Sequence, residues 1–346
     1  MIVTFDTNAY RDLAKDVPLN DVKTMMSEMM NLEVQKGVTA FLGSVSSMEM
    51  LSHLVDNRFS KAYRACIRAC VAAYQHCGNA QQYRMLPSIE SQVAHSFFQR
   101  DNQSAINNQK TLSNLLYLIW QTPSKKTVNA KDMYPSFKSV KDKVVASEQT
   151  LIEEIWNYCM SIDPSFDNWS LFVSNQSKRT KYLNFVRSAD FKVESAMALI
   201  EAVRMHLNEQ YQNITLTGAE MRKMAENLVK HFPVAFKLRT YFFEQLLQPN
   251  FNLTENSRAN FMWDEQILYY VGQTIQGQDI LLVTTDKKML EAANKLGYNR
   301  FVMSLKEYLK FLGFNPEPYR KKPCFIVRFY WRLKGKVFRY LKKKRN

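Results

Sequence analysis

The 346-residue chain is poor in glycine and proline and has no long apolar run, and each shortage excludes a class of protein. With only 9 glycines and 10 prolines, it lacks the many tight turns of an all-β protein, which favours long helices joined by short connections. No run of 18 uninterrupted apolar residues occurs, so the sequence predicts no membrane-spanning helix. No basic and apolar leader precedes the first strand-like segment, so we expect a cytoplasmic protein whose five cysteines are reduced.

Composition and length further limit the class of protein and the number of structural units. Apolar residues make up 46% of the chain and charged residues 23%, close to globular averages, which excludes disordered and collagen-like proteins. A glycine-rich phosphate loop is also missing, which disfavours nucleotide hydrolysis of the P-loop type. The length exceeds the roughly 100–200 residues of an ordinary domain, so we expect two structural units or one domain with a large insertion.

The positive charge is concentrated at the C-terminal end. The formal net charge is +15, and residues 317–346 hold 12 Lys and Arg against a single acidic residue. The remaining 316 residues carry 35 basic and 31 acidic side chains and are therefore almost neutral. The basicity belongs to a tail, so the overall charge says little about the main body.

Both ends of the chain alternate strand and helix, the pattern of a parallel sheet covered by helices. Near the N-terminus, strands are predicted at residues 2–6 and 38–45, and helices at 18–36 and 46–56. Towards the other end, strands are predicted at residues 280–283 and 301–303, and helices at 263–276, 287–296 and 306–312. These two segments together are long enough for one compact α/β domain.

Between them, helical periodicity dominates and no clear strand is found. The predicted helices are residues 62–75, 103–120, 149–160, 184–209 and 218–247, with one of the expected breaks at Pro135. We therefore predict a discontinuous α/β domain of residues 1–56 and 259–313. Residues 57–258 form an all-helical insertion, and residues 314–346 a basic amphipathic tail.

Four acidic residues fall at the C-terminal ends of predicted strands or in the first turns of the neighbouring helices. They are Asp6, Glu49, Asp264 and Asp286. Ligands bind at this edge of open parallel sheets, because strand ends and helix N-termini converge there. Gathered carboxylates repel one another unless a cation joins them, and hard oxygen ligands suit Mg²⁺ or Mn²⁺.

Each acid also has a purely structural interpretation. Glu49 fits a capping box with Ser46, and Asp264 complements the positive end of its helix dipole. Asp286 fits an N-cap, and Asp6 an Asx-type turn. Taken one at a time, these interpretations are at least as good as metal binding. They do not explain why all four acids fall on one edge of one sheet.

The same residues carry a resemblance to a known family. Residues 5–8 (Phe-Asp-Thr-Asn), followed by Glu49 in the helix after the second strand, resemble the opening half of the PIN-domain nucleases. Residues 263–267 (Trp-Asp-Glu-Gln-Ile) and 282–289 (Leu-Val-Thr-Thr-Asp-Lys-Lys-Met) resemble its closing half. The motifs occur in the family's order and cover about a third of the chain. The long helical segment departs from the pattern, since a compact member has a much shorter loop there.

The resemblance implies a three-layer PIN-like fold and a metal-dependent endoribonuclease. Its four acids would hold one or two Mg²⁺ or Mn²⁺ ions and hydrolyse RNA phosphodiester bonds with a metal-activated water, without a covalent intermediate. Asn8 and Thr284 would orient the carboxylates or contact the substrate. Glu265 is the reserve candidate if the register of its helix is off by one residue.

Partners are implied only by family analogy. Compact relatives often act as toxins restrained by an antitoxin, so the analogy allows a toxin or defence role. Single-stranded or looped RNA is the expected substrate, because a shallow acidic site reaches an unpaired backbone more readily than a duplex. The insertion would then select RNA, bind a protein partner or form a homodimer. Two alternatives stay open: a catalytically inactive PIN-like scaffold that binds nucleic acid or protein, and a structure-specific DNA nuclease.

The C-terminal tail is predicted to form an amphipathic helix with one basic face. The basic residues recur every third or fourth position, at Arg328, Arg332, Lys336, Arg339 and Lys343. Aromatic and aliphatic residues recur on the opposite side. The tail is predicted to grip nucleic-acid phosphates, to lie on an anionic membrane surface, or to dock its apolar face on the body or on a partner.

Three cysteines lie on one face of a predicted helix. Cys66, Cys70 and Cys77 are spaced as a core-facing stripe, with His76 adjacent. A zinc site would need a further ligand in good geometry, so we predict buried structural thiols. His53, His95 and His206 have no obvious partner spacing, so neither a histidine general base nor a catalytic triad is predicted.

Overall fold

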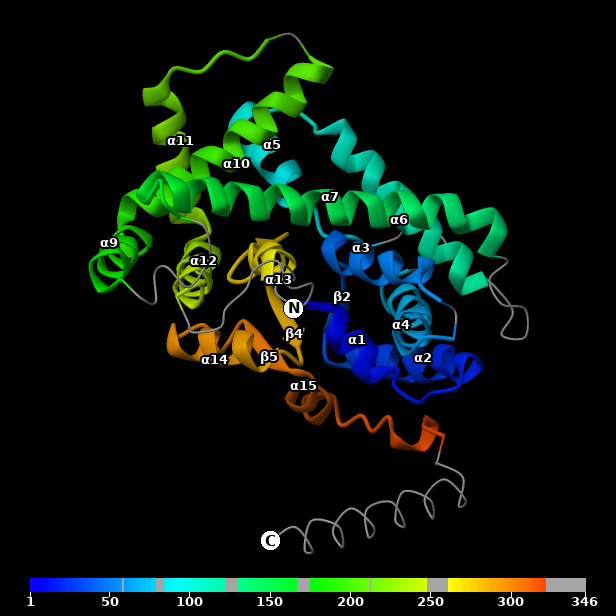
Figure 1. Cartoon of the computed structure of the whole chain (residues 1–346). Helices are drawn as coiled ribbons and strands as arrows, with labels where there is room; N and C mark the ends of the chain where they lie inside the picture. Colours follow the sequence, from blue (N-terminus) through cyan, green and yellow to red (C-terminus); the bar gives the residue numbers. More distant parts are fainter. Residues whose placement is uncertain are drawn as a thin grey trace, which may run out of the picture.

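The computed structural model describes residues 1–57, 59–78, 84–121, 130–166, 175–211, 213–247 and 261–321. These residues are mostly helical and surround one small, mainly parallel sheet (Figure 1). The predicted mixed α/β class is thereby confirmed. No helix in the described residues is both long enough and apolar enough to cross a membrane. The basic residues predicted for the tail lie outside the described residues: Arg328, Arg332, Lys336, Arg339 and Lys343.

The sheet joins strands from the two ends of the chain. Its strands are β1 (Ile2–Phe5), β2 (Thr39–Ala40), β3 (Thr274–Ile275), β4 (Gln278–Thr284) and β5 (Val302–Ser304). Strand β1 lies between β2 and β4 and is parallel to both, with Phe5 opposite Val283. Strand β5 pairs in parallel with the C-terminal end of β4. Strand β3 forms an antiparallel hairpin with the N-terminal end of β4. Strands separated by more than 270 residues are therefore direct neighbours.

Buried apolar runs explain the central strands. All four residues of β1 are buried, as expected for a strand covered on both faces. Val3 and Val283 face a core cluster on one side of the sheet, whereas Ile2 and Leu282 face a second cluster on the other. This alternation follows the two-residue period of a strand.

Six helices belong to the two segments that carry the strands. They are α1 (Thr7–Leu13), α2 (Leu19–Gln35), α3 (Ser44–Ser52), α13 (Phe261–Leu268), α14 (Lys287–Lys295) and α15 (Leu305–Leu312). The predictions for α2, α14 and α15 are confirmed within one residue at each end. Helix α15 begins with a capping box between Ser304 and Glu307 and ends at Gly313, whose φ of +74° suits glycine.

The structure differs from the predictions at three places in these segments. Helix α1 was not predicted. The strand predicted at residues 38–45 is only two residues long, because α3 begins at Ser44. The helix predicted over residues 263–276 ends at Leu268, and the chain then turns into the β3–β4 hairpin. Gln276 and Gly277 both have positive φ there, as the two central residues of a type I′ turn require.

Residues 57–258 are helical wherever the structure describes them, apart from short connections and an isolated bridge between Leu42 and Met85. The helices are α4 (Lys61–Cys77), α5 (Ile89–Phe98), α6 (Gln103–Gln121), α7 (Ala130–Ile162), α9 (Gln176–Arg187), α10 (Ala189–Gln210), α11 (Gly218–His231) and α12 (Pro233–Gln245). Helix α5 was not predicted.

Helices α7 and α9 begin earlier than the predicted residues 149 and 184. Proline and capping residues explain where two predicted helices are divided. The predicted helix 184–209 is divided at Ser188, which caps α10, and the predicted helix 218–247 is divided at Pro233, the first residue of α12. A break was predicted at Pro135, but this residue lies inside α7 and does not interrupt the helix. It lies in the second turn, where its ring removes one backbone donor without ending the helix.

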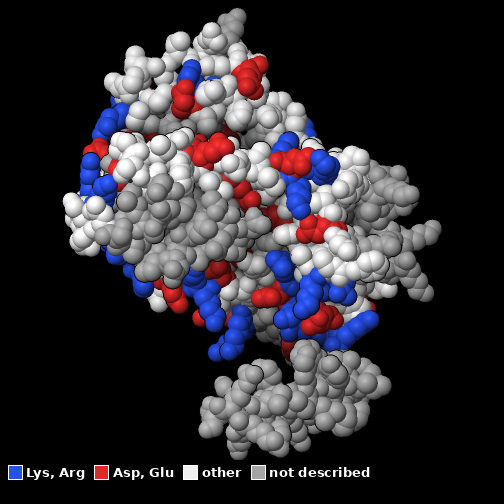
Figure 2. All heavy atoms as spheres, in the orientation of Figure 1, with Lys and Arg blue, Asp and Glu red and all other residues white. Residues whose placement is uncertain are grey.

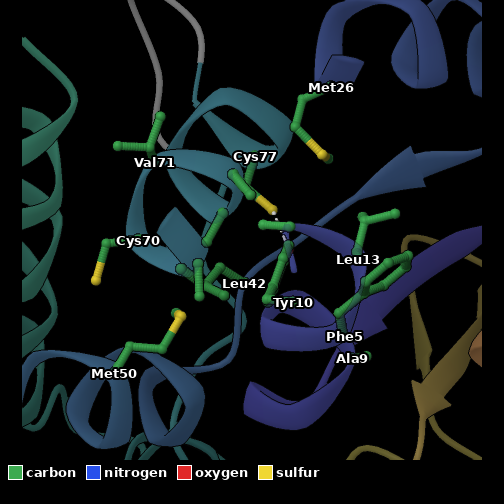
Figure 3. Packing of buried hydrophobic residues seen from close by; sticks show 14 of the residues in the cluster. Phe5, Ala9, Tyr10, Leu13, Met26, Leu42, Met50, Cys70, Val71 and Cys77 are labelled. Atoms are coloured by element: carbon green, nitrogen blue, oxygen red, sulfur yellow. Dashed lines mark hydrogen bonds between the residues drawn. The ribbon is translucent and has the colours of Figure 1, made fainter. Parts of the chain in front are cut away.

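Helices from residues 57–258 cover both faces of the sheet. One core cluster combines α4 and α6 with α1, α2, α15 and one face of the sheet. The other combines α5, α10, α11 and α12 with α13, α14 and the opposite face. Figure 3 shows the first cluster, in which residues of α4 such as Cys77 pack beside Tyr10 and Phe5. The long helical segment thus shares its hydrophobic core with the strands.

Candidate active site

Asp6 is the first residue after β1 and holds the start of α1. Its Oδ1 accepts a hydrogen bond from the amide of Ala9 at 2.5 Å, which makes Asp6 the N-cap of that helix. Its Oδ2 accepts a hydrogen bond from the hydroxyl of Thr284, at the end of β4. The Asp6 carboxylate is buried, and strand pairing fixes its contact with a residue 278 positions away.

Asp286 is placed by the same strand end. The buried Thr284 hydroxyl accepts a hydrogen bond from the Asp286 amide at 2.9 Å. The Asp286 side chain in turn accepts one from the amide of Met289 at 2.9 Å and so caps α14, as the structural interpretation predicted. Thr284 therefore links Asp6 and Asp286 across two adjacent strands.

Glu49 lies inside α3 and points back to the first turn of α1. Its Oε2 accepts a hydrogen bond from the hydroxyl of Thr7 at 2.5 Å. The capping-box interpretation is wrong, because α3 begins two residues before Ser46 and is capped by Gly43. The Ser46 hydroxyl instead donates to the carbonyl of Phe5 at 3.1 Å, which ties α3 to the end of β1.

Asp264 and Glu265 are neighbours in α13 with different surroundings. Glu265 is buried and forms a two-oxygen ion pair with Nη1 of Arg239, at 2.5 and 2.7 Å. The reserve candidate is thus engaged by a basic partner. Asp264 is partly buried in the first turn of the helix, and α13 packs against α3, the helix that carries Glu49.

Electrostatic interactions connect the four acids. Burial raises the pKa of Asp264 well above its usual range, and the charges of Asp286, Glu49 and Asp6 raise it further. Burial also raises the pKa of Asp6 to about 6, with a further contribution from Asp286, against the hydrogen bonds from Thr284 and Ala9. The pKa of Glu49 rises to about 7 by burial and by the charge of Asp6, against the Thr7 hydrogen bond. We call these four residues the acid cluster.

Basic side chains compensate the acid cluster only weakly. In the part of the chain that the structure describes, none of the four acids belongs to an ion pair. The charge of Arg11 lowers the pKa of Glu49, and that of Lys288 lowers the pKa of Asp264, but burial outweighs both. The cluster therefore carries an excess of negative charge once its members ionise.

The donor chemistry of the acid cluster fits a hard divalent cation. Carboxylate oxygens in this number are what Mg²⁺ and Mn²⁺ prefer, and a cation would remove the mutual repulsion. However, no group of three or more His, Cys, Asp or Glu among the described residues is arranged to hold a metal ion. Both oxygens of Asp6, and one each of Glu49 and Asp286, accept hydrogen bonds from the protein. Cation binding would therefore require some of these side chains to move.

Two threonines hold the acid cluster, and sequence reasoning identified one of them. Thr284 was predicted as a supporting residue and contacts Asp6 directly. Thr7 was missed, although its position beside Asp6 places its hydroxyl in the first turn of α1 facing α3. Asn8, the other predicted supporting residue, is exposed and lines a neighbouring pocket.

A second buried polar cluster was also missed. His76 Nε2 lies 2.9 Å from both carboxylate oxygens of Glu33, and its Nδ1 lies 3.0 Å from the hydroxyl of Tyr10. Tyr308 donates to Glu33 at 2.5 Å, and Tyr10 contacts the sulfur of Cys77 at 3.4 Å. We call these five residues the buried network. Their sequence separations, up to 275 residues, leave no local pattern that would reveal the pairing.

The cysteine prediction is confirmed. Cys66, Cys70 and Cys77 are fully buried in the core. Burial raises the pKa of Cys66 to about 11 and that of Cys77 to about 12, so both thiols stay protonated at neutral pH. Figure 3 shows Cys77 directed toward Tyr10.

No protein family, curated protein or solved structure matches this chain.

Proposed function

We propose that the chain is a PIN-like, metal-dependent endoribonuclease whose acid cluster holds Mg²⁺ or Mn²⁺. The proposal depends on one observation: at the C-terminal edge of a parallel sheet, burial and the charges of neighbouring carboxylates raise the pKa values of three acids from separate elements, Asp6, Glu49 and Asp264. Such an arrangement destabilises the fold unless a ligand compensates it, and clustered perturbed acids of this kind are typical of functional sites.

The chain's own residues would position the carboxylates. Thr284 and the Ala9 amide hold Asp6, Thr7 holds Glu49, and the Met289 amide holds Asp286. A divalent ion bound there would lower the pKa of a water molecule and neutralise charge on a phosphate under attack. The core position of Asp6 and Thr284 limits the water that can reach this side of the site.

The organisation of the chain follows from the proposal. Residues 1–56 and 259–313 would be the nuclease domain, and residues 57–258 an insertion that shares its core. The substrate would be single-stranded RNA. A toxin or defence role, an antitoxin, a homodimer and a contact of the tail with RNA, membrane or protein remain predictions from the sequence.

Cleavage assays on labelled single-stranded RNA and DNA test the proposal. We expect the wild-type protein to cleave RNA with Mg²⁺ or Mn²⁺ and to be inactive in EDTA. Because loss of groups that only orient ligands already lowers activity about 10- to 100-fold, Asp6→Asn should lower it more than ~100-fold. Glu291→Gln, on the exposed side of α14, is the matched control and should leave the rate unchanged. A folded Asp6→Asn variant with wild-type activity would contradict the assignment.

A PIN-like scaffold without catalytic activity is the second candidate. It is favoured by the hydrogen bonds that engage the carboxylates and by the lack of a preformed metal-holding group in the described residues. Calorimetric titration of the wild-type protein with Mn²⁺ distinguishes the two. Heat of binding that disappears in Asp264→Asn favours the nuclease, and no binding by a folded protein favours the scaffold. Cleavage of DNA but not RNA would indicate a DNA nuclease.

A further inference from the structure

A pocket of about 610 Å³ lies between α1 and α4. Its volume is in the range of small-ligand sites. Its lining includes two acidic residues, Asp12 and Asp16, and the five basic residues Arg11, Lys15, Lys61, Arg64 and Arg68. Figure 2 shows Lys and Arg side chains gathered in the lower right of the body, where Figure 1 places α1 and α4.

The helix periodicity explains why these charges face one another. Residues 8, 11, 12 and 15 are spaced as one side of α1 and its continuation, and residues 61, 64, 65 and 68 as one side of α4. Helices α1 and α4 pack together, so these residues of both helices line the same pocket. The pattern of basic residues at matched spacing is visible in the sequence once α1 is known to be a helix.

Basic residues outnumber acidic residues in the pocket lining by five to two. In the described part of the chain, none of the five forms an ion pair with a carboxylate. The Nε of Arg68 is buried and has no hydrogen-bond acceptor among the described residues. Burial lowers the pKa of Arg68, and the neighbouring charge of Arg64 lowers it further, against Asp16. An anion bound here would accept a hydrogen bond from the buried Nε and offset the repulsion between the positive charges.

The pocket adjoins the acid cluster. Asn8 lines the pocket and follows Thr7, which holds Glu49. Arg11 also lines the pocket, and its charge lowers the pKa of Glu49. One helix, α1, therefore presents residues to both sites. A polyanion approaching the acid cluster meets repulsion there and attraction immediately beside it.

We propose that this pocket binds a phosphate group of the nucleic-acid strand that the acid cluster cleaves, an inference that rests on the proposed function. Guanidinium groups bind phosphate oxygens through paired hydrogen bonds, and the pocket supplies three of them with two lysines. Held in this way, the strand enters the acid cluster from one direction. The phosphate is either an internal phosphodiester or a terminal phosphomonoester.

Binding assays in EDTA test the pocket without cleavage. The probes are two fluorescent single-stranded RNAs of one sequence, one with a 5′-hydroxyl and one with a 5′-phosphate, measured at several salt concentrations. The pocket variant is Lys61→Gln with Arg64→Gln, since both side chains are exposed and their loss should not unfold the protein. The matched control is Lys223→Gln with Lys230→Gln, which removes two exposed charges from α11.

We expect the pocket variant to bind about 10-fold more weakly at 0.1 M salt, and the control to bind within about 2-fold of wild type. The slope of log K against log salt should fall by about 0.7 for each phosphate that the variant no longer neutralises. Equal loss for both RNAs identifies an internal phosphodiester, and loss confined to the 5′-phosphorylated RNA identifies a terminal phosphate. Either result supports the pocket. Equal affinities of the pocket variant and the control, or no binding by the wild type, would overturn it.

Different results would refute the nuclease proposal and the phosphate-pocket proposal. RNA that binds through the pocket but is never cleaved with Mg²⁺ or Mn²⁺ would refute the nuclease and leave the pocket in place. RNA that is cleaved normally and bound equally by the pocket variant and the control would refute the pocket alone.

Discussion

The acid cluster and the buried network are two groups of polar side chains in one fold, and they differ in how their charges are compensated. In the buried network, the Glu33 carboxylate receives hydrogen bonds from His76 and Tyr308. In the acid cluster, burial and the charges of neighbouring carboxylates raise the pKa values of Asp6 and Asp264. A fully paired group stabilises one packing arrangement, whereas an uncompensated group is suited to bind a ligand.

The comparison is informative because both groups join distant parts of the chain. The buried network connects α1, α2, α4 and α15, and the acid cluster connects β1, α3, α13 and the end of β4. Their sequence separations are similar, at 275 residues for Tyr308 and Glu33 and 278 for Thr284 and Asp6. Sequence separation therefore does not distinguish the acid cluster from the buried network. The difference lies in charge compensation, which mutations can test.

Glu33→Ala should cause the largest change in stability. The variant leaves His76 and the Tyr308 hydroxyl buried without their shared acceptor. Removing one partner of a buried pair typically costs about 3–5 kcal/mol, so the free energy of unfolding should fall by that amount. Urea unfolding followed by circular dichroism measures it. A decrease below about 1 kcal/mol would show that the buried network does not hold these helices together.

The second-largest effect should be a pH dependence of the unfolding free energy that comes from Asp6 in the acid cluster, measured in EDTA. Burial raises the pKa of Asp6 from 3.8 to about 6, so the folded state holds this proton more tightly than the unfolded chain. The stability that results is complete below about pH 4 and is lost as the pH rises to about 6. At about 1.4 kcal/mol per pKa unit, the loss from this group is about 3 kcal/mol.

The difference between wild type and Asp6→Asn isolates that contribution. Urea unfolding of both proteins from pH 4 to pH 7.5 should give curves that diverge, with the variant gaining relative stability as the pH rises. Glu291→Gln serves as the control for a surface carboxylate. Parallel curves for Asp6→Asn and wild type would contradict the raised pKa.

Asp264→Asn should have the smallest effect and the opposite sign to Glu33→Ala. At a pH above the raised pKa of Asp264, the amide removes a charge that Asp286, Glu49 and Asp6 repel. Relief of strain at functional sites commonly adds about 0.5–2 kcal/mol, so we expect the unfolding free energy in EDTA to rise by about 1 kcal/mol. Saturating Mn²⁺ should stabilise the wild type but not this variant. A destabilised variant in EDTA would show that Asp264 is held by attractive contacts.

The sequence predicts the sheet because its strands are short apolar runs that end in polar residues. Residues 2–5 and 280–283 are buried as expected, and the polar residues after them, Asp6 and Thr284, meet at one edge. Predicting that edge requires only the rule that parallel strands align their C-terminal ends. The roles of the four acids as metal ligands stay predictions.

Features that depend on distant pairing could not be predicted. Asp6-Thr7-Asn8 is locally typical of a turn, but Asp6 caps a helix, α1, that packs against α3 and α4. Glu33 sits on a helix whose buried face is otherwise apolar, and its partner His76 is 43 residues away. The buried state of Glu33 is decided by that partner, which no local propensity encodes.

The pairing of β1 with β4 also sets the order of events during synthesis. Asp6 leaves the ribosome early, but Thr284 and Asp286 follow only after about 280 further residues. At roughly 5–20 residues per second, the interval is on the order of tens of seconds. A nascent chain therefore has no assembled group of carboxylates through almost all of its translation. Whatever chemistry those residues perform begins only after Asp286 has been added and the last strands have closed the sheet.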